Sequence, residues 1–265
     1  MEHYQAVVLA LIQGLSEFLP VSSSGHLLLP SQLLGWADQG LAFDVAVHLG
    51  SLIAVVLYFR DDLTRLGVAW TGSVFRGRHC VESTLAWQLI LATAPAALVG
   101  GLFAELIEAH LRSVSVVASA TIFFGVLLGF ADRGSSETAR QQPLSWRHSF
   151  LVGIAQALAL IPGTSRSGVT ITMALALGYS RAAAARFSFL LAIPIIVLSG
   201  GYKGTQILQG GTIDWISMGI GVSVSGLSAY ACIYYFLRFV QRVGMMPFVI
   251  YRVLLGALLL TIGWA

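Results

Sequence analysis

Charged residues are scarce in this sequence. Asp, Glu, Lys and Arg make up only 10% of its 265 residues, while 57% are hydrophobic; a soluble domain carries charge on roughly 25% of its residues. So few charges are a poor match for the surface of a soluble helical protein. A membrane β-barrel is also disfavoured, because its strands give short alternating segments, whereas the apolar runs here are long and unbroken. The sequence therefore predicts an all-α polytopic membrane protein.

Cysteine pairs and an N-terminal targeting signal are also lacking. The two cysteines, Cys80 and Cys232, lie in a polar and an apolar stretch respectively, so nothing suggests a disulfide or a metal–thiolate site. The first residues, MEHYQAVVLA, contain no Lys or Arg before the apolar run, and no clear A-x-A site follows. We therefore do not expect a cleaved signal peptide.

Six segments are apolar over about the 20 residues that a membrane-spanning helix needs. They are residues 41–60, 84–104, 113–131, 182–202, 214–237 and 246–264. We expect each of them to form a full transmembrane span.

Two further apolar regions, 4–35 and 149–178, are each broken by a loop rich in Pro, Gly and hydroxyl residues. The loops are LPVSSSG at 19–25 and PGTSRSG at 162–168. The arm before the first loop, residues 4–18, would be a helix of about 22 Å, too short for a hydrocarbon core of about 30 Å. Each region is therefore predicted to be a re-entrant helix–loop–helix hairpin. Irregular backbone at that depth must be buried in protein or line a hydrated cavity.

The two hairpins resemble each other in sequence. A shift of 143 positions superimposes five identical pairs: Gln13 and Gln156, Leu15 and Leu158, Ser22 and Ser165, Ser24 and Ser167, Gly25 and Gly168. We interpret this as an internal duplication within a single membrane domain, residues 1–265. Repeat one covers about 1–131 and repeat two about 147–264, and a cytoplasmic linker at 132–146 joins them.

The basic residues predict how the chain is oriented. Eleven of the fifteen Lys and Arg residues cluster at connections on one side, including the predicted loop 60–82, and this marks that side as cytoplasmic. They are Arg60, Arg65, Arg76, Arg78, Arg133, Arg140, Arg147, Arg181, Arg186, Arg238 and Arg242. Only Arg112 and Lys203 fall on the opposite side. Both termini are then outside the cytoplasm, and the hairpins enter from opposite sides, so the repeats are inverted.

The two loops hold the groups expected of a phosphate site. Each carries three hydroxyl residues where a helix is predicted to begin, whereas one suffices to cap a helix. They are Ser22, Ser23 and Ser24 in the first loop, and Thr164, Ser165 and Ser167 in the second. Helix N-termini expose unpaired N–H groups that attract phosphate. Arg166 adds a planar guanidinium suited to phosphate oxygens; the alternative for Arg166 is an ion pair with a membrane carboxylate.

Glu17 is the carboxylate nearest to the first loop. Gln13 lies one turn earlier on the same helix face, so Glu17 and the Gln13 carbonyl are candidate ligands for Mg²⁺ or Ca²⁺ bridging to phosphates. The alternatives are an interfacial carboxylate for Glu17 and inter-helix hydrogen bonding for Gln13. His26 is either a general acid or base or only an orienter of the loop.

Two other pairs give weaker signals. Asp44 and His48 lie four apart in the next span and are candidates to support the site. Tyr251 and Arg252 are either a supporting pair or an interfacial anchor.

These motifs together resemble the undecaprenyl-diphosphate phosphatase family of bacterial inner membranes, the bacitracin-resistance type called BacA or UppP. The (E/Q)xxxE and PVSSxGH segments of that family are matched by Gln13, Glu17 and PVSSSGH at 20–26, and its PGxSRSxxT segment by PGTSRSGVT at 162–170. The similarity extends to FDVAVHLGSLIAVV (43–56), FSFLLAIPI (187–195) and PFVIYR (247–252), and so covers nearly the whole chain.

The resemblance implies a hydrolase that converts undecaprenyl diphosphate to undecaprenyl phosphate and inorganic phosphate, recycling the lipid carrier of peptidoglycan and other envelope glycans. It implies a divalent cation, Mg²⁺ or Ca²⁺, and a multi-pass inner-membrane protein with six spans, two re-entrant hairpins and a site open to the periplasm. Bacitracin would compete by sequestering the lipid substrate, and no nucleic acid is expected. A homodimer is left open. Gln13 stands where some members carry Glu, which leaves less negative charge for a metal.

For the mechanism we expect Ser23 to attack the phosphate, Glu17 or His26 to take its proton, and Arg166 to stabilise the transferring group. A metal-activated water, with Ser23 only a phosphate ligand, is the alternative. An inverted-repeat transporter or a polyprenyl-phosphate flippase is the alternative function. The other predicted phosphate-binding residues are Ser22, Ser24, Gly25, Gly163, Thr164, Ser165, Ser167 and Thr170.

Overall fold

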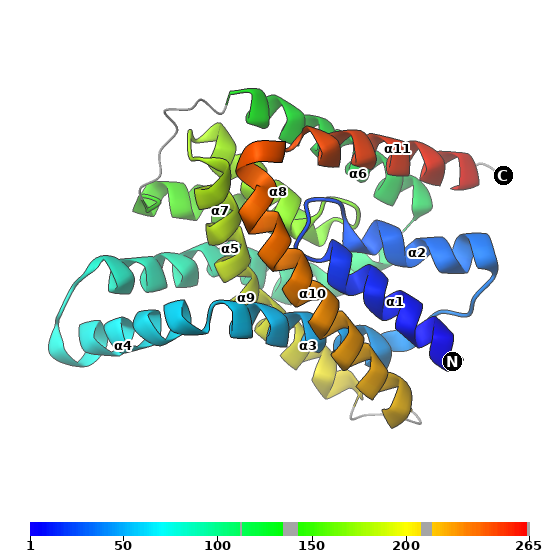
Figure 1. Cartoon of the computed structure of the whole chain (residues 1–265), viewed down its shortest axis with the longest axis horizontal. Helices are drawn as coiled ribbons and strands as arrows, with labels where there is room; N and C mark the ends of the chain where they lie inside the picture. Colours follow the sequence, from blue (N-terminus) through cyan, green and yellow to red (C-terminus); the bar gives the residue numbers. More distant parts are fainter. Residues whose placement is uncertain (112, 135–142, 208–213, 264–265) are drawn as a thin grey trace.

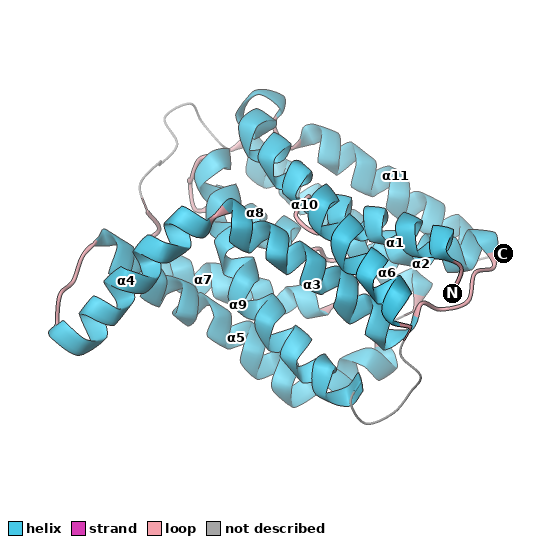
Figure 2. Cartoon of the chain, turned by 60° about the horizontal axis from the view of Figure 1, so that its bottom comes forward, coloured by secondary structure: helices cyan, strands magenta, loops and turns pink. Residues whose placement is uncertain are grey.

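A computed structural model describes residues 1–111, 113–134, 143–207 and 214–263. Within these ranges the chain forms helices and loops, with no strand (Figure 2). The helices are α1 His3–Ser16, α2 Ser23–Leu34, α3 Gly40–Tyr58, α4 Arg60–Arg76, α5 Val81–His110, α6 Val114–Arg133, α7 Trp146–Ala157, the 3₁₀ helix η1 Leu158–Leu160, α8 Arg166–Ala176, α9 Arg181–Ile207, α10 Trp215–Val243 and α11 Met246–Gly263. Residues 135–142 of the predicted linker 132–146 lie outside the described residues.

Five helices are long and apolar enough to cross a membrane: α3, the Val81–Ala104 part of α5, α6, α9 and α10. Large apolar side chains on them remain exposed, such as Leu98, Leu102 and Leu227, as expected where lipid replaces water. The prediction of an all-α polytopic membrane protein is confirmed. The predicted span at 246–264 corresponds to α11, which is apolar but shorter than these five.

The predicted loop at 60–82 is wrong in its first part, where the structure has the 17-residue helix α4. Asp61 and Asp62 lie in its first turn and Arg76 in its last. Acidic groups at the start of a helix and a basic group at its end interact favourably with the helix dipole. Gly77, with a φ of 61°, then ends the helix. The search for apolar spans missed α4 because the helix is polar along much of its surface.

Each predicted hairpin is a pair of short helices. α1 and α2 have 14 and 12 residues, and α7 and α8 have 12 and 11, so each arm is only about 16–21 Å long. Turns at 17–21 and 161–164 separate the arms. Pro20 and Pro162 lie in these turns, where they lack the backbone N–H that a continuing helix would need.

The first arm of each hairpin is fixed against a long helix through a glycine. α1 packs on α10, and α7 packs on α5. A Cβ atom on Gly14 would lie 2.5 Å from the carbonyl oxygen of Ser225, and one on Gly153 would lie 2.6 Å from that of Ala92. Only glycine permits backbones to approach this closely. The turns that follow α1 and α7 therefore have defined positions.

The largest apolar cluster includes residues of α3, α8, α9 and α10. Phe18, in the turn after α1, packs into it, with its ring centroid 5.3 Å from that of Phe189 on α9. Both chain termini lie at the end of the molecule opposite α4 (Figures 1 and 2). The turn after α1 is thus anchored in the main apolar cluster.

Candidate active site

The two hairpin loops are joined to each other by hydrogen bonds. The backbone N–H of Gly163 donates to Ser24 Oγ over 3.1 Å, and Ser167 Oγ donates to the carbonyl oxygen of Leu19 over 2.8 Å. Each loop thus supplies a serine hydroxyl to the backbone of the other. The two polar loops therefore lie against each other.

The two loops also share an unusual backbone turn. Ser22 and Ser165 have φ angles of 72° and 68°, and no other non-glycine residue in the described part of the chain has a positive φ. Such angles are uncommon outside glycine and cost on the order of 1–3 kcal/mol. Both residues immediately precede a helix, α2 and α8. Because Ser22 turns the chain this sharply, α2 begins at Ser23, and the Ser23 hydroxyl lies in the first turn of that helix.

Arg252 of α11 donates hydrogen bonds to the backbone of both loops. Its side chain is fully buried, and it donates to the carbonyl oxygens of Thr121, Pro20, Gly163 and Thr164 over 2.9–3.4 Å. No carboxylate within the described ranges pairs with it. The guanidinium has five N–H donors, and four backbone carbonyls from both hairpins and α6 share them. Of the two interpretations of this residue, the structure supports a supporting role and contradicts an interfacial anchor.

Glu17 is the centre of the polar cluster. Its Oε1 accepts from Arg166 Nη2 over 3.2 Å, and its Oε2 accepts from Ser23 Oγ over 3.1 Å and from Gln13 Nε2 over 2.9 Å. His48 Nε2 lies 3.9 Å from Oε2. The side chains of Glu17 and Arg166 are only 8% and 13% exposed, so each charge needs the other and its hydrogen-bond donors.

Arg166 makes two further contacts that fix its direction. Its guanidinium carbon lies 5.8 Å from the ring centroid of Phe18, and Nη1 donates to the carbonyl oxygen of Ser188 over 3.4 Å. With one N–H directed at Glu17 and one at Ser188, three of its five N–H donors are left for an anion.

His26 makes no hydrogen bond with the Ser23 hydroxyl among the described residues. Its Nδ1 lies 2.7 Å from the carbonyl oxygen of Ser22, and its Nε2 lies 2.6 Å from Tyr251 Oη. Of the two expected proton acceptors, Glu17 is the one within hydrogen-bond distance of the Ser23 hydroxyl. The site is suited to phosphoryl chemistry. It brings together a buried carboxylate, a serine, an arginine and two helix N-termini.

Comparison with known proteins agrees with this chemistry. Residues 6–258 match the family described as bacitracin resistance protein BacA. The chain belongs to the BacA family. A protein of Saccharophagus degradans named undecaprenyl-diphosphatase is 57% identical over 264 residues, covering 100% of this chain and 99% of the relative. Proteins of the same name from Teredinibacter turnerae and Aliivibrio salmonicida are 58% and 54% identical, each covering 98% of both chains.

In this BacA family member, several predicted phosphate ligands direct their hydroxyls inward. Thr170 Oγ1 contacts the carbonyls of Arg166 and Ser167 and the hydroxyl of Ser188, and Ser167 Oγ donates to Leu19. Ser165 Oγ accepts from the N–H of Gly168 and caps α8. The hydroxyls of these three residues therefore stabilise the loops through hydrogen bonds within the protein.

Four other predicted phosphate-binding residues are buried in the loops. Gly163 has a φ of 93°, and a Cβ there would lie 2.2 Å from the carbonyl oxygen of Val117. Ser22 is buried, with its hydroxyl 3.2 Å from that of Ser24. Gly25 is also buried. Thr164 Oγ1 is buried without a hydrogen-bond partner among the described residues, which leaves its hydroxyl open to a ligand or water.

The donor set near Glu17 fits a divalent cation that phosphates also bind. Gln13 is fully buried, and its Oε1 has no hydrogen-bond partner in the described part of the chain. No cluster of three or more His, Cys, Asp or Glu side chains in those residues could hold a metal. A carboxylate and one amide oxygen are hard-cation ligands that would leave positions for phosphate or water. Asp44 is not part of this set, because it accepts from Gln39 and contacts His48 only through its backbone carbonyl.

Residues of α3 and α11 contribute more to the site than their sequence signals indicated. His48, Tyr251 and Arg252 all contact the site. Arg252 carries a signal that would have found it, because an ionisable residue inside an apolar span is a functional candidate by default. No signal in the sequence links Tyr251 to His26, 225 positions earlier.

Proposed function

We propose that this chain hydrolyses undecaprenyl diphosphate to undecaprenyl phosphate and inorganic phosphate. The observation that carries the proposal is the contact of Ser23 Oγ and Arg166 with one buried carboxylate, Glu17, at the meeting point of two helix N-termini. The names of the relatives agree with it. The lipid product would return to the synthesis of peptidoglycan and other envelope glycans. Loss of free undecaprenyl diphosphate would leave less target for bacitracin and so confer resistance.

In the mechanism, Ser23 is the nucleophile. Glu17 takes the proton of the Ser23 hydroxyl as Oγ forms a bond to the terminal phosphorus, and the electron pair of the breaking P–O bond stays on undecaprenyl phosphate. Water then attacks the phosphoserine and releases inorganic phosphate. The free N–H groups of Arg166 and of the first turns of α2 and α8 stabilise the charge on the transferring group.

A divalent cation, Mg²⁺ or Ca²⁺, would be held by Glu17 and the free Oε1 of Gln13. When bound, it would supply positive charge to the diphosphate oxygens. The alternative route, in which water attacks directly and Ser23 only binds phosphate, stays open to the experiment below.

We further propose six spans, with α11 as the sixth, and two re-entrant hairpins in inverted repeats. Repeat one would comprise α1 to α6, and repeat two α7 to α11. The packing of α1 on α10 has its counterpart in that of α7 on α5, and the turns at Ser22 and Ser165 correspond. Both termini lie at the end opposite α4 (Figure 1), which supports periplasmic termini in the bacterial inner membrane if α4 is cytoplasmic. We propose that the active site opens to the same periplasmic side.

The test is phosphate release from undecaprenyl diphosphate by the purified full chain, with and without a chelator. We expect turnover that the chelator abolishes and added Mg²⁺ or Ca²⁺ restores. Ser23→Ala should lose on the order of 10³-fold or more in kcat, whereas Ser31→Ala, near the other end of α2, should not. A radiolabelled phosphoserine at Ser23 would support the covalent route, and oxygen-18 entering phosphate with no such intermediate would overturn it. Wild-type turnover in both Glu17→Ala and Arg166→Ala would refute the site.

A further inference from the structure

The hydrogen bonds of His26 fix which of its nitrogens carries a hydrogen. A carbonyl oxygen can only accept, so the 2.7 Å contact with Ser22 requires Nδ1 to be the donor. In the neutral ring Nε2 then has the lone pair, and Tyr251 donates its phenol hydrogen to it over 2.6 Å. If Nε2 is also protonated, it donates to Tyr251 Oη instead. The phenol hydrogen is then free for another acceptor, such as a phosphate oxygen.

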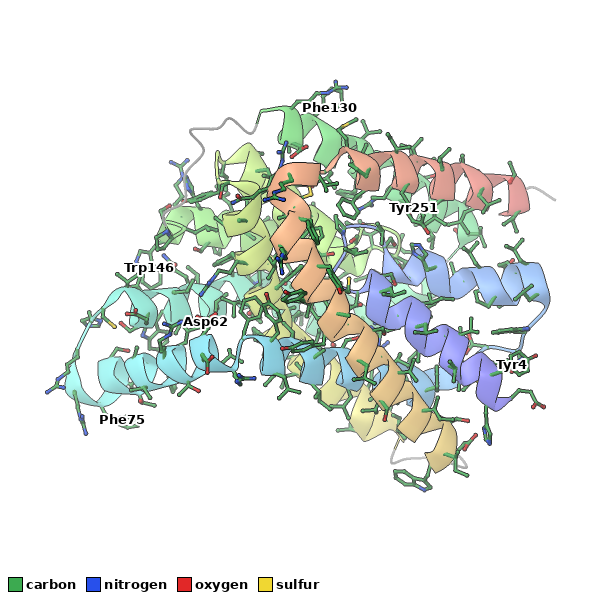
Figure 3. The ribbon with its side chains drawn as sticks, in the orientation of Figure 1. Tyr4, Asp62, Phe75, Phe130, Trp146 and Tyr251 are labelled. Atoms are coloured by element: carbon green, nitrogen blue, oxygen red, sulfur yellow. The ribbon has the colours of Figure 1, made fainter. Side chains whose placement is uncertain are left out.

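Tyr251 lies where the polar loops meet the apolar surface of α11. It is 45% exposed and is located between α11 and α2 (Figure 3). Leu254 and Leu258 lie on the same face of α11, because positions three and seven residues apart on a helix point the same way. Both are exposed, at 64% and 44%. Tyr251, Leu254 and Leu258 thus form an exposed stripe with a hydroxyl at one end and apolar side chains along the rest. A lipid phosphate has the same arrangement, a polar phosphate followed by a long hydrocarbon chain.

The phenol is also held at a fixed position relative to Ser23. The next residue, Arg252, is fully buried and donates to the carbonyls of Pro20 and Gly163, so α11 cannot shift along the loops. Ser23 and His26 are three residues apart on α2 and therefore neighbours on one face, with Cβ atoms about 5–6 Å apart. Because Tyr251 Oη lies 2.6 Å from His26 Nε2, the phenol is on the same face of α2 as Ser23, and one diphosphate on that face can meet both hydroxyls.

We propose that Tyr251, held by His26, binds the phosphate that leaves with the lipid, while Ser23 and Arg166 act on the terminal phosphate. This inference rests on the proposed function. As the bond between the terminal phosphorus and the bridging oxygen breaks, its electron pair stays on the bridging oxygen, which departs in undecaprenyl phosphate. With His26 Nε2 protonated and donating to Tyr251 Oη, Tyr251 donates its phenol hydrogen to an oxygen of that departing phosphate.

The hydrocarbon chain then lies along the stripe formed by Tyr251, Leu254 and Leu258. This places the two products of the reaction in separate subsites. Undecaprenyl phosphate occupies the subsite of Tyr251, and inorganic phosphate occupies the subsite of Arg166.

The test compares the binding of the two products to the full chain in detergent. The dissociation constants of undecaprenyl phosphate and of inorganic phosphate are measured by calorimetry for the wild type and Tyr251→Phe. We expect Tyr251→Phe to weaken the binding of undecaprenyl phosphate about tenfold, because one hydrogen bond to a charged group is lost. The constant for inorganic phosphate should stay within about twofold, since no contact of Arg166 changes.

Tyr179→Phe is the matched control. It removes a phenol hydroxyl from a second His–Tyr pair, in which His148 Nδ1 lies 2.9 Å from Tyr179 Oη at the start of α7. Both constants should match the wild type. Equal binding of undecaprenyl phosphate by Tyr251→Phe and wild type, or equal weakening of both products, would overturn the inference. Because binding is measured without turnover, a wild-type chain that binds both products but releases no phosphate from the diphosphate would instead refute the proposed function.

Discussion

Glu17 and Arg166 join the two hairpins through an ion pair, in which Arg166 Nη2 lies 3.2 Å from Glu17 Oε1. The two residues are 149 positions apart in the chain. Both are almost excluded from solvent, and a single charge in such a place is strongly unfavourable. Each hairpin therefore supplies the charge that the other requires, and the site is complete only when both loops meet.

The first prediction concerns this pair. Glu17→Gln and Arg166→Gln should each lower kcat/KM at least about 100-fold, because each removes a group that acts on the substrate and leaves a buried charge unpaired. The double variant should lose little more than either single variant, since residues that act as a unit are not additive. The measurement is kcat/KM for phosphate release by the four proteins. Losses that simply multiply would show that the two side chains act independently.

The second prediction concerns the hydrogen bond between the loops. Ser24→Ala removes the acceptor of the Gly163 N–H, and leaving this group unsatisfied should cost about 1–3 kcal/mol of stability. Thermal unfolding in detergent should show a lower Tm. Ser31→Ala is the control, because the Ser31 hydroxyl bonds only within α2, to Leu28. An unchanged Tm for Ser24→Ala would mean that this hydrogen bond does not hold the loops together.

The two broken helices could be predicted because the local composition of the sequence encodes them. The short apolar arms, the prolines and the clustered hydroxyls of 19–25 and 162–168 predicted two broken helices, and the structure has them. The family motifs indicated that Glu17 and Arg166 belong to one site. The contact between Glu17 and Arg166 forms only in the folded protein, where the first hairpin supplies Glu17 and the second supplies Arg166.

Other features depend on geometry that no local pattern contains. The positive φ of Ser22, which starts α2 at Ser23, is imposed by the packing of the loop and not by the propensity of serine. The position of Tyr251 against His26 depends on how α11 lies beside α2. The helix α4 was missed because hydropathy identifies spans, whereas α4 is recognised by charges at its ends.

The third prediction tests the role of Arg252. Arg252→Met keeps much of the side-chain volume but removes the guanidinium that donates to four buried carbonyl oxygens, of which Gly163 O keeps a second donor, Thr121 Oγ1. We expect a loss of about 1–3 kcal/mol for each buried carbonyl oxygen left unsatisfied, and a clear fall in the Tm of the full chain in detergent. Arg238→Met is the control, because Arg238 is exposed and its guanidinium bonds only to Tyr234. Equal Tm values for the two variants would show that Arg252 does not hold the loops.

The fourth prediction compares two glycines in helices. At Gly153 a Cβ would lie 2.6 Å from the carbonyl oxygen of Ala92, so Gly153→Ala must push α7 away from α5, at a cost of about 1–3 kcal/mol. At Gly67 in α4 no atom lies within 4 Å of the added Cβ, and Ala there should stabilise the helix by about 0.5–1 kcal/mol. The Tm should therefore fall for Gly153→Ala and stay level or rise for Gly67→Ala. Because α7 leads into the loop that carries Arg166, Gly153→Ala should also reduce kcat while Gly67→Ala leaves it unchanged. A Gly153→Ala protein with wild-type Tm and kcat would show that the contact between α7 and α5 does not position the second loop.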